Sequence, residues 1–351
     1  MWYNIYMGNY YDGTKLLSMS DINGNKPEIY LCTTNRSGGK TTYFSRLLVN
    51  RFKEKGEKFA LLYRFNYEVE DCADKFFKDI NTLFFPTDVM TSKRRANGIY
   101  HELFLNNVSC GYAIAMNSSD QLKRYSHMFS DVCRILFDEF QSETNHYCND
   151  EVKKFISIHT SIARGQNKQV RYVPVYMLGN AVSLLNPYYI ELGISTRLKP
   201  ETNFLKGDGF VLEQGFVETA SRAQMESSFN RAFADSQYMT YSNSKNVYLN
   251  DNTAFVEPPS GKSRYMCTIR CNGTDYAIRE YTEMGIIYCD NKADMTFPIK
   301  ISVTTEDHGI NYVMMRRNNL FIQNLRWYFE HACFRFKDLK CKEAVLTALS
   351  Y

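Results

Sequence analysis

Apolar positions in the first two hundred residues follow two alternating periods. Short apolar runs typical of buried strands lie at 29–32, 59–63, 99–105, 112–116, 132–137 and 173–178. Helices are expected over 41–55 and 151–163, and the first presents one apolar face made of Phe44, Leu47, Leu48 and Phe52. Strands that alternate with helices indicate an α/β sheet with crossover helices, and the stretch from Asn106-Asn107 to Gly111 predicts a hairpin turn between two of the strands.

The pattern changes after residue 218. Ser, Asn, Gln and Ala dominate 219–259, and the prolines at its end are typical of a linker. Beyond it, short strands are expected at 264–270, 277–281, 285–289 and 299–304, followed by helices from 318 to 349. We therefore expect an α/β domain over 1–218, a linker over 219–259 and a smaller α+β domain over 260–351.

The sequence T-N-R-S-G-G-K-T-T separates the first expected strand from the first expected helix. It matches G-x-x-x-x-G-K-[ST] except at its start, where Thr34 replaces a Gly and, being β-branched, resists positive φ. In this pattern backbone N–H groups wrap phosphates at a helix N-terminus, the Lys bridges the outer two phosphates, and the hydroxyl holds Mg²⁺. The expected nucleoside triphosphate site consists of Thr34, Asn35, Arg36, Ser37, Gly38, Gly39, Lys40, Thr41 and Thr42.

A second motif, V-C-R-I-L-F-D-E-F, ends a buried strand in two carboxylates. Asp138 is expected in the Mg²⁺ shell with Thr41, and Glu139 is expected to activate the attacking water, as a hydrolysing P-loop enzyme requires. Asn291-Lys292-Ala293-Asp294 spells the guanine-binding N-K-x-D. Because it follows the linker, whereas base recognition belongs on the sheet of the phosphate loop, we interpret it as coincidental.

Other polar residues have two interpretations each. Asn180 either ends a strand, where its side chain responds to the γ-phosphate, or forms a turn with Gly179. Arg164 either complements the dipole at the end of its helix or acts as an arginine finger in a neighbouring subunit. Two basic clusters are either solvated surface or DNA contacts, namely Lys93-Arg94-Arg95 and Lys123-Arg124.

Composition narrows the class of protein. With 351 residues, 44% hydrophobic and 23% charged, the chain suits two folded domains, and its net charge of +4 restricts any nucleic-acid contact to local patches. The ten cysteines lack the spacing of a zinc ribbon or a small disulfide scaffold, so reduced, mostly buried thiols are expected. No signal peptide and no run of 18 apolar residues is visible, which predicts a soluble cytosolic protein.

Together these motifs resemble those of the DNA-encapsidation ATPases of small, short-tailed, protein-primed bacteriophages, relatives of the large terminase subunit. The resemblance covers about residues 29–189, and more weakly the rest. It is carried by N-R-S-G-G-K-T with Arg36, by I-L-F-D-E-F, and most specifically by G-N-A-V-S-L-L-N-P-Y-Y. It implies a P-loop ATPase domain of the additional-strand, catalytic-glutamate type, followed by a ribonuclease-H-like domain, with ATP and Mg²⁺ as cofactors.

The resemblance also implies a function and partners. Such proteins form a homo-oligomeric ring, usually of five subunits, docked on the portal of an empty capsid in the infected cell, and pump double-stranded DNA. The hydrolytic set would be Lys40, Thr41, Asp138 and Glu139, with Arg36 and Asn180 contacting or sensing phosphate. Arg164 would be the trans-acting finger, with Lys123 or Arg124 as a second one. Whether an RNA scaffold takes part stays open, and no membrane is implied.

Two alternatives are kept. A nuclease-competent terminase would hold two metals on carboxylates of its second domain. The first strand expected there, 265–269, has none, although Asp275, Asp290 and Asp294 lie nearby, so we expect a non-cleaving domain that contacts DNA, portal or RNA. A nucleotide-regulated DNA-binding module with negligible turnover would need neither Glu139 nor a trans-acting arginine.

Overall fold

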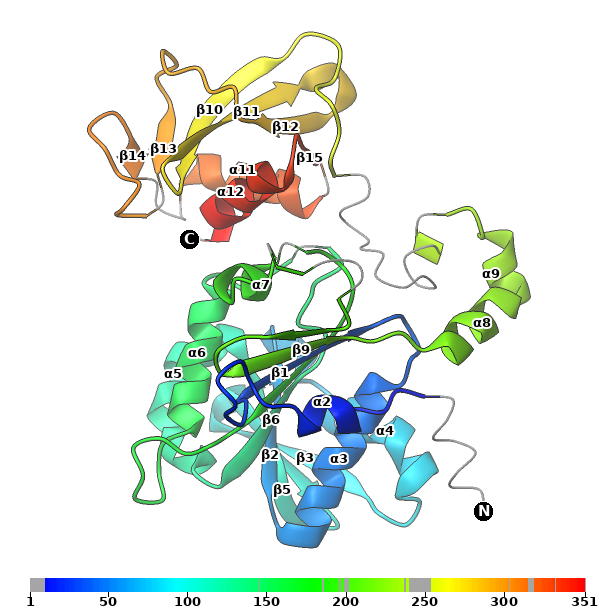
Figure 1. The fold of residues 1–351 in the computed structure, drawn as a ribbon. Helices are drawn as coiled ribbons and strands as arrows, with labels where there is room; N and C mark the ends of the chain where they lie inside the picture. The colour runs from blue at the N-terminus through cyan, green and yellow to red at the C-terminus, as the bar shows by residue number, and fades with distance from the viewer. Residues whose placement is uncertain are drawn as a thin grey trace. The chain divides into compact units, whose positions relative to one another are not determined.

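The computed structural model describes residues 10–144, 146–184, 186–195, 197–198, 202–236, 238–239, 254–302, 304–314, 319–331 and 333–350 (Figure 1). The chain divides into two compact units. The N-terminal unit contains Met1–Phe140, Glu151–Ala181 and Lys199–Val247, and the C-terminal unit contains Gln141–Asp150, Val182–Leu198 and Tyr248–Tyr351. Two short segments within the expected first domain, Gln141–Asp150 and Val182–Leu198, thus belong to the C-terminal unit, and the predicted consecutive domain ranges did not include this exchange. Part of the expected linker, 240–253, lies outside the described residues.

The N-terminal unit is built on a nine-stranded sheet of order β3-β4-β5-β2-β6-β7-β1-β9-β8. Its centre consists of parallel strands, namely β2 (Lys58–Tyr63), β6 (Val132–Phe137), β7 (Val175–Asn180), β1 (Ile29–Thr34) and β9 (Phe210–Gln214). These strands are largely buried, which is why they are nearly continuous apolar runs in the sequence. The strand before the phosphate-loop motif and the strand before the two acids are separated by β7.

Helices cover this sheet on both faces (Figure 1). On one face, α3 (Lys40–Lys55) and α4 (Cys72–Phe84) bury Phe44, Leu48 and Phe76 in a core shared with alternate strand residues. On the other face, α6 (Glu151–Ile162) packs Phe155 against Phe137, whose ring centroids lie 6.3 Å apart. The expected α/β architecture with crossover helices is therefore confirmed, although α4 was not predicted.

One edge of the sheet is antiparallel, formed by β3 (Met90–Arg95), β4 (Tyr100–Leu105) and β5 (Val108–Ala115). Asn106 and Asn107, with φ of 49° and 66°, form the two-residue turn between β4 and β5. The predicted hairpin turn is confirmed in place, but it is shorter than predicted, because β5 begins at Val108 and includes Gly111. Strand β3 was not predicted.

Shorter elements complete the N-terminal unit and the segments that interrupt it. The helices are α2 (Thr14–Ser18), α5 (Ser119–Leu122), α7 (Pro187–Glu191), α8 (Glu218–Glu226) and α9 (Ser228–Ala232). The remaining strand is β8 (Phe204–Lys206), and the 3-10 turns are η1 (Asn66–Glu68), η2 (Ala96–Gly98), η3 (Met116–Ser118) and η4 (Lys123–Phe129). Residues expected to be linker therefore include two helices, α8 and α9.

The C-terminal unit has a six-stranded sheet of order β14-β13-β10-β11-β12-β15. An antiparallel meander consists of β10 (Arg264–Cys271), β11 (Thr274–Tyr281) and β12 (Ile286–Asp290), with η5 (Thr282–Met284) in its second turn. The parallel additions are β13 (Lys300–Ser302) beside β10, β14 (Val313–Met314) beside β13, and β15 (Phe334–Phe336) beside β12. The expected α+β character is confirmed.

Two helices cover this second sheet. The apolar faces of α11 (Leu320–Glu330) and α12 (Leu339–Ser350) share a core with β10, β11 and β12. All ten cysteines are free and eight are buried, as expected. Among the helices that the structure describes, none combines the length and apolar character needed to cross a bilayer.

Candidate functional site

The loop between β1 and α3 has the backbone that the phosphate-loop motif requires. Ser37 and Gly39 have φ of 58° and 89°, in the left-handed region, and α3 begins at Lys40. A Cβ at Gly38 would lie 3.0 Å from Val217 Cγ2, so a larger residue there would crowd the loop. The first N–H groups of α3 have no partners within the helix and are available to an anion.

Thr34 is the last residue of β1 and lies outside the left-handed part of the loop. It pairs in register with Asn180, is buried, and its Oγ1 donates to the Asn35 carbonyl over 2.9 Å. The expected conflict between a β-branched residue and positive φ is wrong, because the positive φ values belong to Ser37 and Gly39.

Segments distant in sequence support the loop from outside. Asn35 exchanges hydrogen bonds with the backbone of Val217, its Oδ1 accepting over 2.8 Å and its Nδ2 donating over 3.1 Å. Gln224 on α8 donates to Ser37 Oγ over 2.7 Å. The N–H of Tyr11 donates to the Gly38 carbonyl over 2.8 Å. The loop is therefore held by two segments that its motif does not include, the one around Tyr11 and the one that runs from Val217 into α8.

Two side-chain pairs join the ends of the central strands. Lys40 Nζ donates to Asn180 Oδ1 over 2.7 Å, and Thr41 Oγ1 donates to Asp138 Oδ2 over 2.8 Å. Asn180 is the final residue of β7, so its interpretation as part of a turn is wrong. We call Lys40, Thr41, Asp138, Glu139 and Asn180 the strand-end site, because it lies where β1, β6 and β7 end.

Glu139 has an unusual backbone. Its φ of 56° places a non-glycine residue in the left-handed region, which costs on the order of 1–3 kcal/mol and persists only where surrounding contacts impose it. Its N–H donates to Asp138 Oδ1 over 2.9 Å, and the residue is exposed. Water therefore has access to the residue that follows the metal-binding candidate Asp138.

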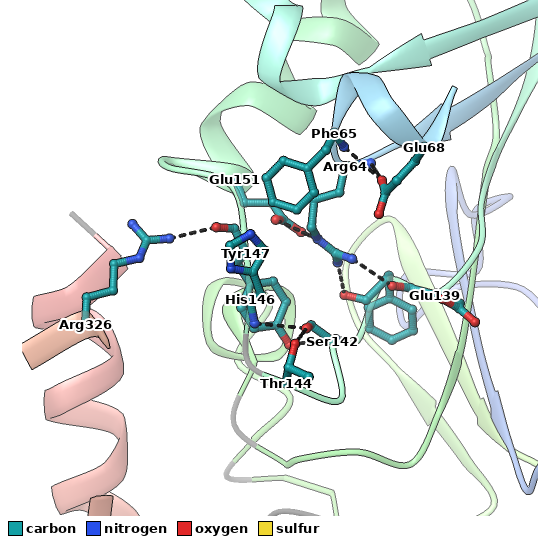
Figure 2. Close-up of polar contacts among 11 residues, drawn as sticks. Arg64, Phe65, Glu68, Glu139, Ser142, Thr144, His146, Tyr147, Glu151 and Arg326 are labelled. Atoms are coloured by element: carbon teal, nitrogen blue, oxygen red, sulfur yellow. Dashed lines mark hydrogen bonds and ion pairs between the residues drawn. The ribbon is translucent and has the colours of Figure 1, made fainter. Parts of the chain in front are cut away.

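Arg64, which sequence analysis missed, imposes part of this geometry (Figure 2). It directly follows β2, is 7% exposed, and its Nη1 and Nη2 donate to the carbonyls of Glu139 and Phe140 over 3.1 and 2.8 Å. Its Nε forms an ion pair with Glu151 over 2.9 Å. The sequence did offer a clue to Arg64, which is a charged residue directly after the apolar run 59–63. Because β2 lies beside β6, with Leu62 opposite Phe137, a residue after β2 is placed close to the residues after β6.

Burial raises the pKa of two groups under the loop. It raises the pKa of the Cys32 thiol in β1 to about 12, so this thiol stays protonated and is no nucleophile. Burial also raises the pKa of the Glu213 carboxyl, which accepts a hydrogen bond from Tyr11 Oη over 2.6 Å.

Arg36 extends from the loop toward the segment after β9. Its guanidinium carbon lies 5.2 Å from the ring centroid of Tyr238. A cavity of about 370 Å³ beside it is lined by Arg36, Gln224, Phe229, Asn230, Phe233, Ser236, Tyr238 and Met239. Phosphate contact by Arg36, as by Thr42 in the first turn of α3, stays a prediction.

Arg164 lies away from the strand-end site. Helix α6 begins at Glu151, beside Arg64, and its 12 residues span about 18 Å, so Arg164 follows the opposite end of the helix. At that end, Arg171 contacts the carbonyl of Ala163 and the carbonyl of Val132, where β6 starts rather than where it ends. Arg164 is exposed, and its side chain has no hydrogen bond or ion pair to any residue within the described ranges. The helix ends at Ile162, one residue before the predicted end at 163, and the N–H of Ala163 still donates to the His159 carbonyl over 2.8 Å.

The basic clusters occupy surface positions. Lys93, Arg94 and Arg95 are exposed on the edge strand β3, where Arg95 forms an ion pair with Glu102 over 2.6 Å. Strand geometry places Lys93 and Arg95 on one face and Arg94 on the other, and charge on an edge strand also prevents edge-to-edge pairing. Of the second cluster, in η4, Lys123 forms an ion pair with Asp120 over 3.1 Å, and Arg124 is exposed.

The three aspartates of the C-terminal unit that were considered as metal ligands accept hydrogen bonds from residues of the same unit. Asp275 accepts from Arg270 and from Tyr312 Oη, and Asp290 accepts from the N–H of Lys292 over 2.7 Å. Asp294 accepts from Thr296 in a turn. No cluster of three acidic, histidine or cysteine side chains suited to a metal occurs among the described residues. The N-K-x-D string lies at the end of β12, on the other sheet from the phosphate loop.

Comparison with known proteins gives concordant matches. Residues 7–349 match the family model described as Podovirus DNA encapsidation protein (Gp16). The DNA packaging protein of Bacillus phage phi29 is 24% identical over 309 residues, covering 86% of this chain and 87% of that protein. The corresponding protein of Bacillus phage B103 is 23% identical over 307 residues, covering 86% and 90%.

Solved structures share the fold. A chain of the bacteriophage Phi-29 viral genome packaging motor assembly superposes with a TM-score of 0.53 at 22% identity, covering 98% of both chains. A chain of the Phi-28 gp11 DNA packaging motor gives 0.56 at 15% identity, also covering 98% of both. Similarity at this identity extends to the arrangement of the strands and helices.

Proposed function

This chain belongs to the Podovirus DNA encapsidation protein family, and we propose that it is the ATP-driven motor that moves double-stranded viral DNA through the portal into a procapsid. The observation that carries the proposal is the strand-end site, where Lys40 contacts Asn180 and Thr41 contacts Asp138. These are the groups that bind and hydrolyse a triphosphate in P-loop enzymes. The DNA substrate and the portal partner are proposed from membership in the family.

The residues present fit ATP and Mg²⁺. The tight loop at Gly38 and the left-handed Gly39 leave backbone N–H groups for phosphates, and Lys40 would bind the outer two. Thr41 and Asp138 offer the oxygen ligands that Mg²⁺ prefers, and few protein ligands suffice because phosphates and waters complete its shell. When bound, the metal supplies neutralisation of phosphate charge.

The remaining side chains divide the chemistry of hydrolysis. Glu139 accepts a proton from the attacking water, and its exposed position gives that water access. Asn180 exchanges its contact with Lys40 for one with the terminal phosphate and so reports its loss. Arg64 holds the backbone of Glu139 from β2.

Strand order supports finer assignments of the two domains. The position of β7 between β1 and β6 supports a P-loop ATPase domain of the additional-strand, catalytic-glutamate type. The order β12-β11-β10-β13-β14, with β13 parallel to β10, supports a ribonuclease-H-like fold for the second domain. Along the sequence we propose a first domain over 1–218, a linker over 219–259 and a second domain over 260–351. Three segments depart from these consecutive ranges, since Gln141–Asp150 and Val182–Leu198 are grouped with the C-terminal unit and 219–247 with the N-terminal unit.

The family supports a ring of subunits, for which we propose five. In it Arg164, and Lys123 or Arg124, act on the nucleotide of a neighbouring subunit. The ring docks transiently on the procapsid in the cytoplasm of the infected host cell. The exposed, unengaged side chain of Arg164, among the residues described, supports a role outside its own subunit.

Replacing Glu139 by Gln tests the proposal. The variant is expected to bind ATP normally, because the loop is intact, and to lose at least about a hundredfold in turnover, because the proton acceptor is gone. Glu54→Gln, at an exposed position of α3, makes the same chemical change as a control. Steady-state phosphate release and binding of a fluorescent ATP analogue measure both quantities. Near-normal turnover by Glu139→Gln would refute the assignment.

A further inference from the structure

Two of the three strands whose ends form the strand-end site, β6 and β7, continue directly into the C-terminal unit. β6 leads through Asp138, Glu139 and Phe140 into Gln141–Asp150, and β7 leads through Asn180 into Val182–Leu198. Both segments are grouped with the C-terminal unit. Asp138, Glu139 and Asn180 thus lie only two or three residues along the chain from segments of that unit.

Buried hydrogen bonds join these two segments to each other and to α12. Gln141 Oε1 accepts from the N–H groups of Val182 and Ser183 over 3.1 and 3.0 Å. Ser183 Oγ accepts from Lys342 Nζ on α12 over 2.8 Å. Gln141, Ser183 and Lys342 are at most 3% exposed, so leaving these groups unpaired would be costly.

Arg326 on α11 holds the far end of Gln141–Asp150 (Figure 2). Its Nη2 donates to the carbonyl of Tyr147 over 2.7 Å, and its Nη1 donates to Asn149 Oδ1. Tyr147 in turn accepts at its Oη from the N–H of Ser142 over 3.2 Å. Arg326 is therefore linked through Tyr147 to Ser142, which lies three positions after Glu139.

The two roots of the same segment are fixed to one side chain of the N-terminal unit. Arg64 binds the carbonyls of Glu139 and Phe140 before the segment and the carboxylate of Glu151 after it. Arg64 therefore holds the segment at its two ends, and Arg326 holds it at Tyr147 and Asn149 between them. Glu139 lies at the first of these ends with its backbone in the strained left-handed region, so loss of the Arg326 contacts weakens the restraint on its conformation.

We propose that Arg326 is a positioning residue for hydrolysis. Through Gln141–Asp150 it keeps Glu139 in its reactive orientation, so that the state of α11 in the C-terminal unit sets the rate of ATP turnover. The inference rests on the proposed function, because it assigns to Arg326 an effect on the reaction at Glu139.

Arg326→Met tests this in the full chain, because it removes both donors and keeps most of the side-chain length. We expect kcat for ATP to fall by about tenfold to a hundredfold, since small displacements of reacting groups have effects of this size. KM and the Kd of a fluorescent ATP analogue should stay within about twofold, because the phosphate loop is untouched. Arg326→Lys, which keeps a donor, should be intermediate.

A matched control and a second readout separate positioning from loss of fold. Gln323→Ala, exposed on the same helix, should behave as wild type. Hydrogen exchange in Arg326→Met should accelerate at amides 139–150 and stay unchanged in β10–β12. Wild-type kcat and exchange in a folded Arg326→Met would overturn the inference and leave the proposed function intact. Absence of turnover in the wild type itself would refute the proposed function, and this inference with it.

Discussion

The two sheets of this protein have similar apolar centres and different strand ends. In the N-terminal unit, polar side chains from the ends of β1, β6 and β7 face one another, as Lys40 faces Asn180 and Thr41 faces Asp138. In the C-terminal unit, central β10 carries no carboxylate, and Asp275 is engaged by Arg270. The difference teaches that chemistry depends on which groups converge at strand ends, and α/β layering alone does not supply it.

The units also differ in how they use a buried charge. Arg64 and Glu151 have side chains only 8% and 1% exposed, and this pair connects two elements near the strand-end site. Arg270 and Asp275 are 29% and 17% exposed and join adjacent strands of one hairpin. The first pair organises a site, whereas the second stabilises its own hairpin.

The largest expected effect concerns whether the strand-end site is completed by another subunit. Arg164→Ala should lower ATP turnover by about a thousandfold or more, the range for a trans-acting arginine. Mixing it with Lys40→Ala subunits should restore part of the activity, because intact Lys40 and intact Arg164 then meet at some interfaces. Lys168→Ala, in the same exposed turn, serves as the control. Rings that assemble without any recovery would return Arg164 to a surface role.

The next effect compares the two charge pairs directly. Arg64→Met should lower the free energy of unfolding by about 3–5 kcal/mol, because it removes the cationic partner of the buried Glu151 carboxylate. Arg270→Met should cost about 1 kcal/mol or less, because water screens its more exposed pair. Denaturant titrations of both variants measure the difference. Equal losses would contradict the distinction drawn between the two units.

A smaller effect concerns DNA binding by the edge strand. If Lys93, Arg94 and Arg95 bind phosphates, replacing all three by Gln should flatten the slope of log K against log salt by about 0.9 for each phosphate that is no longer neutralised. Because Arg94 faces away from the other two, we expect the change in slope that one or two phosphates would give, and not three. The charge-matched control replaces exposed Lys55, Lys75 and Lys78. An unchanged slope would contradict DNA binding by this cluster, and its charges would then serve only to prevent edge-to-edge pairing of β3.

The smallest expected effect is none at all. The full chain incubated with plasmid and Mn²⁺ should leave the DNA intact, because the central strand β10 supplies no carboxylate to a metal and Asp275 is bound by Arg270. Gel analysis of supercoiled and nicked plasmid provides the measurement. Nicking that depends on Mn²⁺ and disappears in Asp290→Ala would instead favour a nuclease-competent terminase.

Contiguous patterns determined much of this protein. The residues from Thr34 to Thr42, the pair Asp138-Glu139 and the central strands β1, β2, β6 and β7 were all predicted, because each depends on neighbours in sequence and on a local period. The turn at Asn106-Asn107 was predicted for the same reason, since it requires residues that tolerate positive φ. The order of these strands within one sheet was not predicted.

Only the tertiary structure decided which distant residues meet. Lys40 lies 140 positions from Asn180 in sequence, and Arg64 lies 75 positions from Glu139, and no local period encodes either contact. The same holds for the segments after β6 and β7, which belong to the C-terminal unit although they lie far from the rest of it in sequence. The period of apolar residues predicts whether a position is buried. The hydrogen-bond partner of a buried polar group depends on which distant segments pack together in the tertiary structure.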